Sequence, residues 1–314
     1  MGRYLTSRIL QAIVVVFAAT LLLYALVYAM PGDPIAALAG EDVTLDATTR
    51  AALAAKYNLD KPFIEQYFLY LGNVFQGDLG TTFAGRPVTE IIGSAFPVTV
   101  RLTVIAVIIE TIVGVGVGLL AGRKKGSGFD SVTMVVTMIL LGVPSFVVAF
   151  LVQYTFGVKL RWMTPTVSAA ATWTELIAPA VVLAIGSIAF LIRFTRSGVA
   201  DILSSEHVKA ARARGIPEWR ISIVHVLRNA LIPIVTVIGT EFGGLLGGAI
   251  ITEAVFNIPG FGQQVYQHII RGEAAPTVSL VSFLVVIFVT VNLLVDLLYA
   301  VLNPMVRYGA KNVA

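Results

Sequence analysis

The chain has 314 residues, of which 57% are hydrophobic and 13% are charged, and its mean hydropathy is +0.87. Soluble domains carry about 25% charged residues, so this composition excludes an ordinary soluble domain and indicates an integral membrane protein. The chain contains no cysteine, which excludes disulfides and cysteine-bound metals. The formal net charge of +4 does not predict a nucleic-acid partner. In a membrane protein the positions of the positive charges matter more than their sum.

Six apolar runs predict six transmembrane helices. Crossing the hydrocarbon layer takes roughly 20 residues, and lipid offers the backbone no hydrogen-bond partner, so the runs are expected to be helical. The predicted fold class is an all-α integral membrane protein. The runs lie at residues 9–30, 98–121, 131–157, 176–191, 231–252 and 278–302. The first run leads into Pro31 and Pro34 rather than a small-residue cleavage site, which indicates a retained anchor and not a signal peptide.

Most Lys and Arg residues lie before the first run, between the second and third, between the fourth and fifth, and after the sixth. This bias predicts a multi-pass protein of a cell membrane with both termini in the cytoplasm. Four segments follow. They are an N-terminal end with the first transmembrane helix (1–30), an extracytoplasmic segment (31–97), a core of five transmembrane helices containing a cytoplasmic loop at 192–230 (98–302), and a cytoplasmic tail (303–314).

The extracytoplasmic segment is expected to hold two short helices. Asp46 is suited to cap one that ends near Asn58. Pro62 is suited to the first position of another, which carries several aromatic residues. The segment serves either as a structural cap or as a docking surface for an external partner.

The cytoplasmic loop has an unusual order of residues. Ser204 or Ser205 is suited to cap a helix over 206–214, and Gly215 supplies the left-handed residue that ends such a helix. Pro217 then suits the first turn of a second helix. Three alanines (Ala210, Ala211 and Ala213) make one surface of the first helix narrow, so that its backbone can lie deep in a partner's groove. A basic loop can also contact lipid headgroups, but that role does not require the alanines, the glycine and the proline in this order.

Small and charged residues inside the runs suggest where helices touch and where a path lies. Gly114, Gly118 and Gly122 in the second run, and Gly239, Gly243 and Gly247 in the fifth, each recur every four residues, a spacing that lets two helix backbones approach closely. These glycines either let the helices of the bundle pack closely or, in the fifth run, line a translocation path or a subunit contact.

Charged groups within transmembrane runs are functional candidates. Glu241, near the middle of the fifth run, either gates the path and meets a substrate's amino group or bonds to a neighbouring helix. Asp296, in the sixth run, is expected to form a structural pair with another polar residue. The side chain of Arg101 is expected to reach the outer membrane interface. The partner of Glu110, in the second run, is not evident from the sequence.

The cytoplasmic loop resembles the EAA loop of ABC importer permeases, in which Glu-Ala-Ala is followed by three residues and Gly, then by nine residues and Ile-x-Leu-Pro. Here Lys209-Ala210-Ala211 precedes Gly215, Lys209 replaces the glutamate, His225 replaces the isoleucine, and the proline is displaced to Pro233. These departures resemble the oligopeptide, dipeptide and nickel branch of the family, whose pattern matches 206–215 and 225–233. Further segments that resemble the B-type permease of this branch are 30–34, 77–80, 86–88 and 245–262.

This resemblance implies an ABC importer type I permease fold with a cytoplasmic coupling helix. The chain would form half of the pore of an importer for short peptides, in a heterodimer with a second permease. Two ATP-binding subunits would bind ATP-Mg, and an extracytoplasmic substrate-binding protein would deliver the substrate. The residues implied in coupling to the ATPase are Glu206, Lys209, Ala210, Ala211, Ala213 and Gly215. The path or gate is assigned to Glu241, Gly243 and Gly247.

The chain lacks the Gly-x-x-x-x-Gly-Lys-Ser/Thr phosphate loop. We therefore expect a non-catalytic subunit that binds no cofactor or metal itself. The outer loop 253–277 is expected either to contact the substrate-binding protein through Asn257, Pro259, Gly260 and Arg271 or to form a simple exposed hairpin.

Two groups of alternatives stay open. Within the same branch, the substrate is glutathione or a nickel complex instead of a peptide. Outside it, a stand-alone secondary transporter would show inverted repeats with matching broken helices, and no convincing pair is found. A membrane enzyme would need a metal-ligand or nucleophile motif, but the three histidines (His207, His225 and His268) fall outside the predicted spans.

Overall fold

The computed structural model describes residues 2–29, 46–56 and 60–302, and within these ranges the chain is helical, with one isolated β-bridge between Thr81 and Pro87. The resembling motif at 30–34 and the tail at 303–314 lie outside the described residues. The α-helices are α1 (Gly2–Ala29), α3 (Ala47–Lys56), α4 (Phe63–Phe75), α5 (Val88–Arg123), α6 (Gly128–Gly142), α7 (Ser145–Val152), α8 (Trp173–Leu203), α9 (Glu206–Ala213), α10 (Glu218–Arg220), α11 (Arg228–Phe256), α12 (Phe261–Ile270) and α13 (Ala274–Leu302). Two π-helical segments, η1 (Gln153–Lys159) and η2 (Ile221–Leu227), continue α7 and precede α11.

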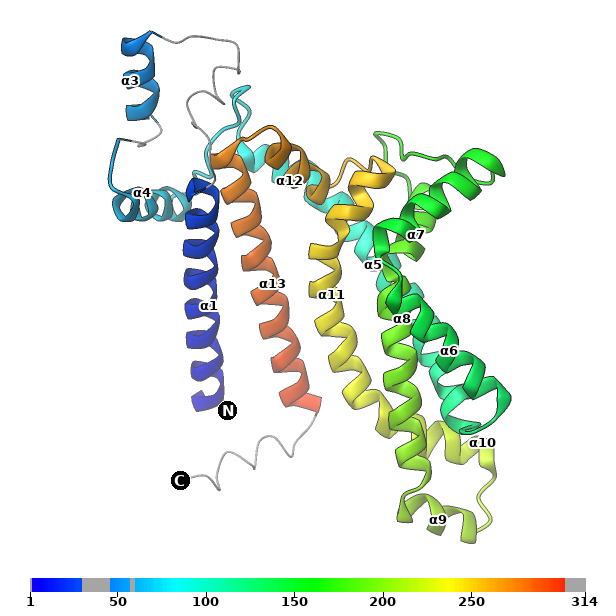
Figure 1. Ribbon diagram of the computed structural model, residues 1–314. Helices are drawn as coiled ribbons and strands as arrows, with labels where there is room; N and C mark the ends of the chain where they lie inside the picture. Colours follow the sequence, from blue (N-terminus) through cyan, green and yellow to red (C-terminus); the bar gives the residue numbers. More distant parts are fainter. Residues whose placement is uncertain (1, 30–45, 57–59, 303–314) are drawn as a thin grey trace.

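Five helical stretches in the described part of the chain are long and apolar enough to cross a membrane, and a sixth arises if a bent helix pair counts as one span. The five are Thr6–Leu26, Val88–Arg123, Trp173–Leu203, Glu218–Phe256 and Ala274–Leu298. Figure 1 shows α9 and α10 at one end of the molecule and α3, α4 and α12 at the other. We call these the α9 end and the α12 end.

The predicted third span is not one straight helix. Gly128–Gly142 and Ser145–Lys159 meet at an angle of 97° around Pro144. Proline lacks a backbone N–H and its ring disfavours helical geometry in the residue before it. Val143 is accordingly extended, with φ −90° and ψ 125°. The sequence predicted a kink at Pro144, and the structure shows a sharp bend.

The cytoplasmic loop predicted at 192–230 is also shorter than expected. Helix α8 continues to Leu203, and the second predicted helix runs through α10 and η2 directly into α11. At the start of the second span, α5 begins at Val88 rather than at residue 98. Its first turns are amphipathic, with Val88, Ile91 and Ala95 buried against Phe261 and Leu280. A search for uniformly apolar runs misses such turns.

The core of the bundle is the pairing of α5 with α8. At Gly114, Gly118 and Gly122, an added Cβ would lie 2.7 Å from Leu191, 2.6 Å from Thr195 and 2.8 Å from Val199, respectively. Helices α5 and α8 therefore lie in van der Waals contact along the face of α5 that carries these three glycines, as the four-residue spacing predicted.

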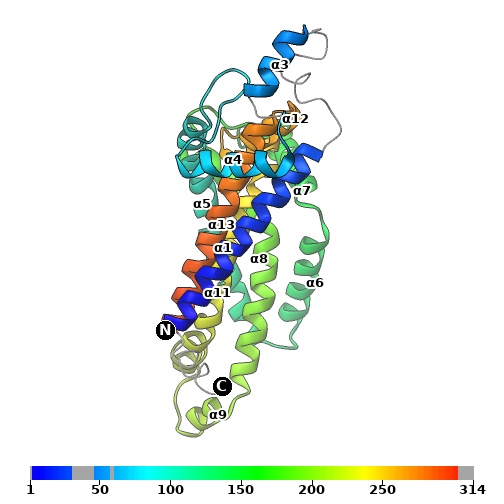
Figure 2. The same ribbon diagram turned by 90° about the vertical axis from the view of Figure 1, so that its left-hand side faces the viewer.

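Helix α4 lies crosswise over α1 near the α12 end (Figure 2). Tyr67 of α4 is buried and packs edge-on against Phe17 and Tyr24 of α1, with ring centroids 5.6 Å apart in each pair. The Tyr67 hydroxyl donates to the Phe17 carbonyl over 3.1 Å. Two helices were expected in this segment, and the structure places them at Ala47–Lys56 and Phe63–Phe75.

Candidate functional site: the α9 end and the polar groups within the bundle

Helix α9 covers Glu206–Ala213 and begins after Ser205, one of the two predicted cap residues. The Ser205 hydroxyl does not bond to the α9 backbone; it donates to the Ile202 carbonyl at the end of α8 over 2.5 Å. The helix ends as predicted. Gly215 has a φ of +74°, and its N–H donates to the Arg212 carbonyl over 2.9 Å, while Ile216 N–H donates to the Ala211 carbonyl over 3.3 Å. Such a left-handed position favours glycine.

One face of α9 packs on the rest of the chain. Val208 and Ala211 are buried, three residues apart on the same side of the helix. They join a cluster formed by α8, η2 and α11, whose other buried members are Leu191, Val199, Ile221, Val226, Ala230 and Ile234. The three alanines therefore do not form one outward surface, because Ala211 faces inward while Ala210 and Ala213 are exposed.

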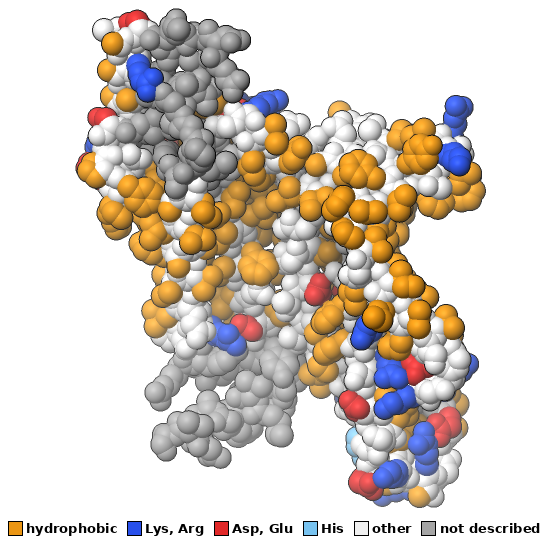
Figure 3. Space-filling model, in the orientation of Figure 1, with side chains coloured by type: hydrophobic (Ala, Val, Ile, Leu, Met, Phe, Trp, Pro, Cys, Tyr) orange, Lys and Arg blue, Asp and Glu red, His pale blue; other side chains and the backbone are white. Residues whose placement is uncertain are grey.

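The outward face of α9 is polar. Glu206, Lys209 and Arg212 are exposed, and Lys209 Nζ lies 2.7 Å from Glu206 Oε1. Arg212 Nε lies 2.7 Å from Glu218 Oε1, which ties α9 to α10. The hydrogen bond to Glu218 raises the pKa of the Arg212 guanidinium, so that this group remains charged. Figure 3 shows charged side chains gathered at this end and hydrophobic ones covering the middle of the molecule.

A bidentate ion pair attaches the first turn of α6 to α8. Arg196 donates from Nε to Asp130 Oδ1 over 2.9 Å and from Nη2 to Asp130 Oδ2 over 2.7 Å. Gly126 N–H donates to Asp130 Oδ2 over 2.8 Å, so the turn before α6 is held as well. Sequence reasoning missed this pair. The sequence around Asp130 shows only a local pattern, in which Ser127 caps α6 three residues earlier. That pattern does not reveal a partner on α8.

Inside the bundle, the predicted path residues fall into different surroundings. Glu241 is half-buried on α11, and its Oε2 accepts a hydrogen bond from Ser187 Oγ of α8 over 2.9 Å. At Gly243 an added Cβ would lie 3.2 Å from Phe288 of α13, so this glycine serves helix packing. Gly247 is exposed, and an added Cβ would meet nothing within 4 Å. The structure thus brings Glu241 and Gly247 to accessible positions and Gly243 to a helix contact.

Two further charges have partners. Asp296 Oδ2 lies 3.3 Å from Arg8 Nη1, which joins α13 to α1 and confirms the structural pairing predicted for Asp296. The Arg101 guanidinium lies 6.0 Å from the centre of the Trp173 ring. Glu110, by contrast, is fully buried, and neither of its carboxyl oxygens has a hydrogen-bond partner among the residues that the structure describes.

At the α12 end, the four residues expected to meet an external protein differ in exposure. Asn257 and Arg271 are exposed, Pro259 is half-buried, and Gly260 is buried. Asn257 has a φ of +51° and ends α11, and its Oδ1 accepts from Gln263 Nε2 over 2.5 Å. Only Asn257 and Arg271 therefore present their side chains at this surface in full.

A buried carboxylate organises the same end. Glu253 Oε1 accepts from Thr99 Oγ1 over 2.5 Å, and Glu253 Oε2 accepts from Gln263 N–H over 2.9 Å. Thr99 Oγ1 also accepts from Phe261 N–H over 2.8 Å. The first N–H groups of a helix lack partners within the helix, and Glu253 and Thr99 bond to them here. Sequence reasoning did not single out this pair, because its members lie on α5 and α11, far apart in sequence.

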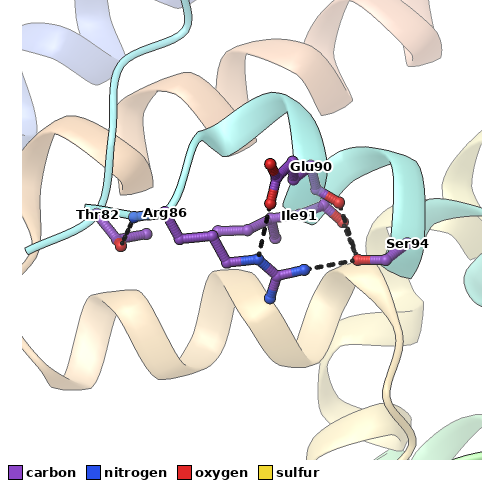
Figure 4. A network of polar contacts seen from close by, with 5 residues as sticks. All are labelled: Thr82, Arg86, Glu90, Ile91 and Ser94. Carbon is purple, nitrogen blue, oxygen red and sulfur yellow. Dashed lines mark hydrogen bonds and ion pairs between the residues drawn. The ribbon is translucent and has the colours of Figure 1, made fainter. Parts of the chain in front are cut away.

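The start of α5 carries a second polar network (Figure 4). Arg86 donates from its backbone N–H to Thr82 Oγ1 over 3.1 Å and from Nη2 to Ser94 Oγ over 3.2 Å. Its Nε lies 3.8 Å from Glu90 Oε2. These contacts fix the turn that leads into α5. Within the described ranges, no group of three or more His, Asp or Glu side chains lies close enough together to hold a metal ion.

Comparison with known proteins places this arrangement in a family. Residues 114–308 match the binding-protein-dependent transport system inner membrane component, and residues 1–103 match the N-terminal region of such membrane components. The glutathione transport system permease protein GsiC of Escherichia coli K12 is 34% identical over 309 residues, covering 98% of this chain and all of that protein. The GsiC protein of Pectobacterium atrosepticum is 36% identical with the same coverage.

A solved structure shares the fold. A chain of the MetNI methionine ABC transporter in an inward-facing conformation matches with a TM-score of 0.57 and 18% identity, covering 68% of this chain and 97% of that one. The chain therefore belongs to the family of binding-protein-dependent transport system inner membrane components, and it is an ABC importer permease of the branch that its sequence motifs indicated.

Proposed function

We propose that this chain forms half of the translocation pore of an ATP-driven importer for short peptides, with glutathione among its candidate substrates. The observation that carries the proposal is α9, a short charged helix at one end of the bundle that is fastened to two long helices and keeps a polar face free. The similarity to glutathione permeases supports a peptide-like substrate. A nickel complex is the less favoured alternative, since no metal-holding group lies among the described residues.

The proposed coupling works through the rigid attachment of α9. Its inner face is packed through Val208 and Ala211, and Arg212 is tied to Glu218. A partner ATPase that contacts Glu206, Lys209, Ala210 and Ala213 would therefore move α8 and α11 together with α9. In this proposal Gly215 ends the helix and Ala211 acts through packing. ATP-Mg is bound by two separate ATP-binding subunits, and this chain hydrolyses nothing itself.

The proposed substrate path follows α11. Glu241 offers an accessible carboxylate that suits a peptide's ammonium group, and Gly247 leaves open space six residues further along the same helix. Gly243 contributes by letting α13 approach closely. A second permease, a different chain in the proposed heterodimer, would complete the pore.

The proposed orientation places the α9 end in the cytoplasm. Helix α1 begins and helix α13 ends at that end (Figure 1), which agrees with both termini being cytoplasmic. The α12 end would then face an extracytoplasmic substrate-binding protein, which Asn257 and Arg271 would contact, while Pro259 and Gly260 shape the loop between α11 and α12.

The test replaces the exposed Ala210 with tryptophan in the assembled transporter, purified with its ATP-binding subunits. A large side chain on the outward face of α9 should prevent docking, so we expect the ATP-binding subunits to dissociate and uptake of a radiolabelled tripeptide to be lost. Ala51→Trp is the matched control, because Ala51 is an exposed helical alanine near the α12 end. If Ala210→Trp retains its ATP-binding subunits and uptake, α9 is not the coupling element.

A further inference from the structure

Three polar side chains from three helices lie at one level of the bundle. Helices α5 and α8 run in the same direction, since Gly114 packs on Leu191 and Gly118 packs on Thr195. One helical turn back along both places Glu110 level with Ser187. The Ser187 hydroxyl donates to Glu241 Oε2 of α11 over 2.9 Å, which brings the Glu241 carboxyl to the same level.

The two carboxyls have unlike surroundings. Glu110 is 0% exposed, and its oxygens accept no hydrogen bond from any residue that the structure describes. Glu241 is half-buried and has the Ser187 hydroxyl as a donor. An ionised carboxylate without a partner is very costly to bury, and a second negative charge nearby raises that cost.

Four other charged groups on helices packed against α5 have partners of their own. Arg196 of α8 is engaged by Asp130 of α6, and Glu253 of α11 is engaged by Thr99 and the first turn of α12. His268 of α12 lies beside Glu273, and Asp296 of α13 lies beside Arg8. In the described part of the chain, the ion pairs include neither Glu110 nor Glu241.

We propose that Glu110 is an intramembrane proton-binding site, held as the neutral acid, and that Glu241 carries the single negative charge of the pair. When two acids differ this strongly in surroundings, the buried and unpartnered one retains the proton and the partly solvated one ionises. The pair then presents one negative charge, on the accessible residue. The assignment of the proton stands independently of the proposed function; only the use of the Glu241 charge to meet a substrate's ammonium group rests on it.

Infrared difference spectroscopy of the purified complex in lipid tests the assignment directly. A neutral carboxylic acid has a carbonyl stretch that a carboxylate lacks, and a carboxylate has its own pair of stretches. At neutral pH, Glu110→Gln should lose a neutral-acid band relative to the wild type, and the matched variant Glu241→Gln should lose carboxylate bands. If Glu110→Gln loses carboxylate bands instead, or if Glu241→Gln loses the neutral-acid band, the proposal is wrong.

A second measurement on the unaltered chain guards against variants that fail to fold. A membrane-soluble carbodiimide adds to neutral carboxylic acids, with the carboxyl oxygen bonding to its central carbon and the acid proton passing to its nitrogen. Peptide mass spectrometry should find the adduct on Glu110 and not on the more accessible Glu241; an adduct on Glu241 with none on Glu110 would contradict the assignment. Uptake by Glu241→Gln tests the path separately. Wild-type uptake would remove Glu241 from the path and leave the proton on Glu110 unaffected.

Discussion

Along the face of α5 that meets α8, three positions leave room for little more than a hydrogen atom. A Cβ at Gly118 would lie 2.6 Å from the Cβ of Thr195 and 2.8 Å from the Ile192 carbonyl oxygen. Neither atom is the far end of a flexible side chain, so the helices themselves would have to separate. Dispersion contacts fall off steeply with distance, and a small separation along this stripe weakens the main packing surface of the core.

We therefore expect Gly118→Ala to destabilise the protein by about 1–3 kcal/mol, the usual cost of overpacking. The matched control is Gly116→Ala, because Gly116 lies in the same helix and an added Cβ there meets nothing within 4 Å. Thermal unfolding of the purified chain in one detergent compares the two. Equal unfolding temperatures for both variants would show that the close approach of α5 and α8 contributes nothing measurable.

At the scale of elements, α12 is held at its first turn by side chains from two other helices. Thr99 of α5 both donates to Glu253 of α11 and accepts from Phe261 N–H of α12. Glu253 in turn accepts from Gln263 N–H. Because Glu253 and Thr99 are buried, their hydrogen bonds have no water to replace them. Helix α12 is thereby fixed relative to α5 and α11, the helices that lead toward the α9 end.

Removing the Thr99 hydroxyl should therefore loosen α12. We expect Thr99→Val to cost about 1–3 kcal/mol, because it leaves buried polar partners unsatisfied. Thr103→Val provides the control, since Thr103 is equally buried one turn along α5 and its hydroxyl has no hydrogen-bond partner among the described residues. Hydrogen exchange of the α12 amides should speed up in Thr99→Val alone. The same rate in both variants would show that the bond does not anchor the helix.

The elements that the sequence predicted well are those specified by neighbouring residues. Pro62, Pro217 and Gly215 mark helix ends through backbone restrictions that act locally, and α4, α10 and α9 begin or end beside them. The inward face of α9 was not predicted, because which side of a short helix packs depends on where α8 and α11 lie. For the same reason, the partners of Asp130 and Glu253, which lie on distant helices, could not be read from local patterns.

At the scale of the whole molecule, the family matches divide the chain into two parts. Residues 1–103 and 114–308 match separate family descriptions, and the MetNI chain covers only 68% of this one. Helix α1 packs mainly on α13, and Arg8 lies 3.3 Å from Asp296 across that contact. Helix α4 is attached in turn to α1 through Tyr67. Helices α1 and α4 thus lie beside the α5–α8 core, and the contact of α1 with α13 is their main attachment to it.

The attachment of α4 to α1 should depend on Tyr67. This side chain is 1% exposed, packs on two aromatic rings and shares a hydrogen bond of 2.9 Å with Thr20. Truncating a buried aromatic residue to alanine costs about 3–5 kcal/mol, so Tyr67→Ala should release α4 while the α5–α8 core stays folded. A glutamate-specific endoprotease should then cleave after Glu65 of α4 faster than in the wild type, whereas Phe75→Ala, at a residue on α4 that is 86% exposed, should leave the rate unchanged. If the two variants are cleaved at the same rate, α4 is held in place by contacts other than the aromatic cluster, and the N-terminal layer does not depend on Tyr67.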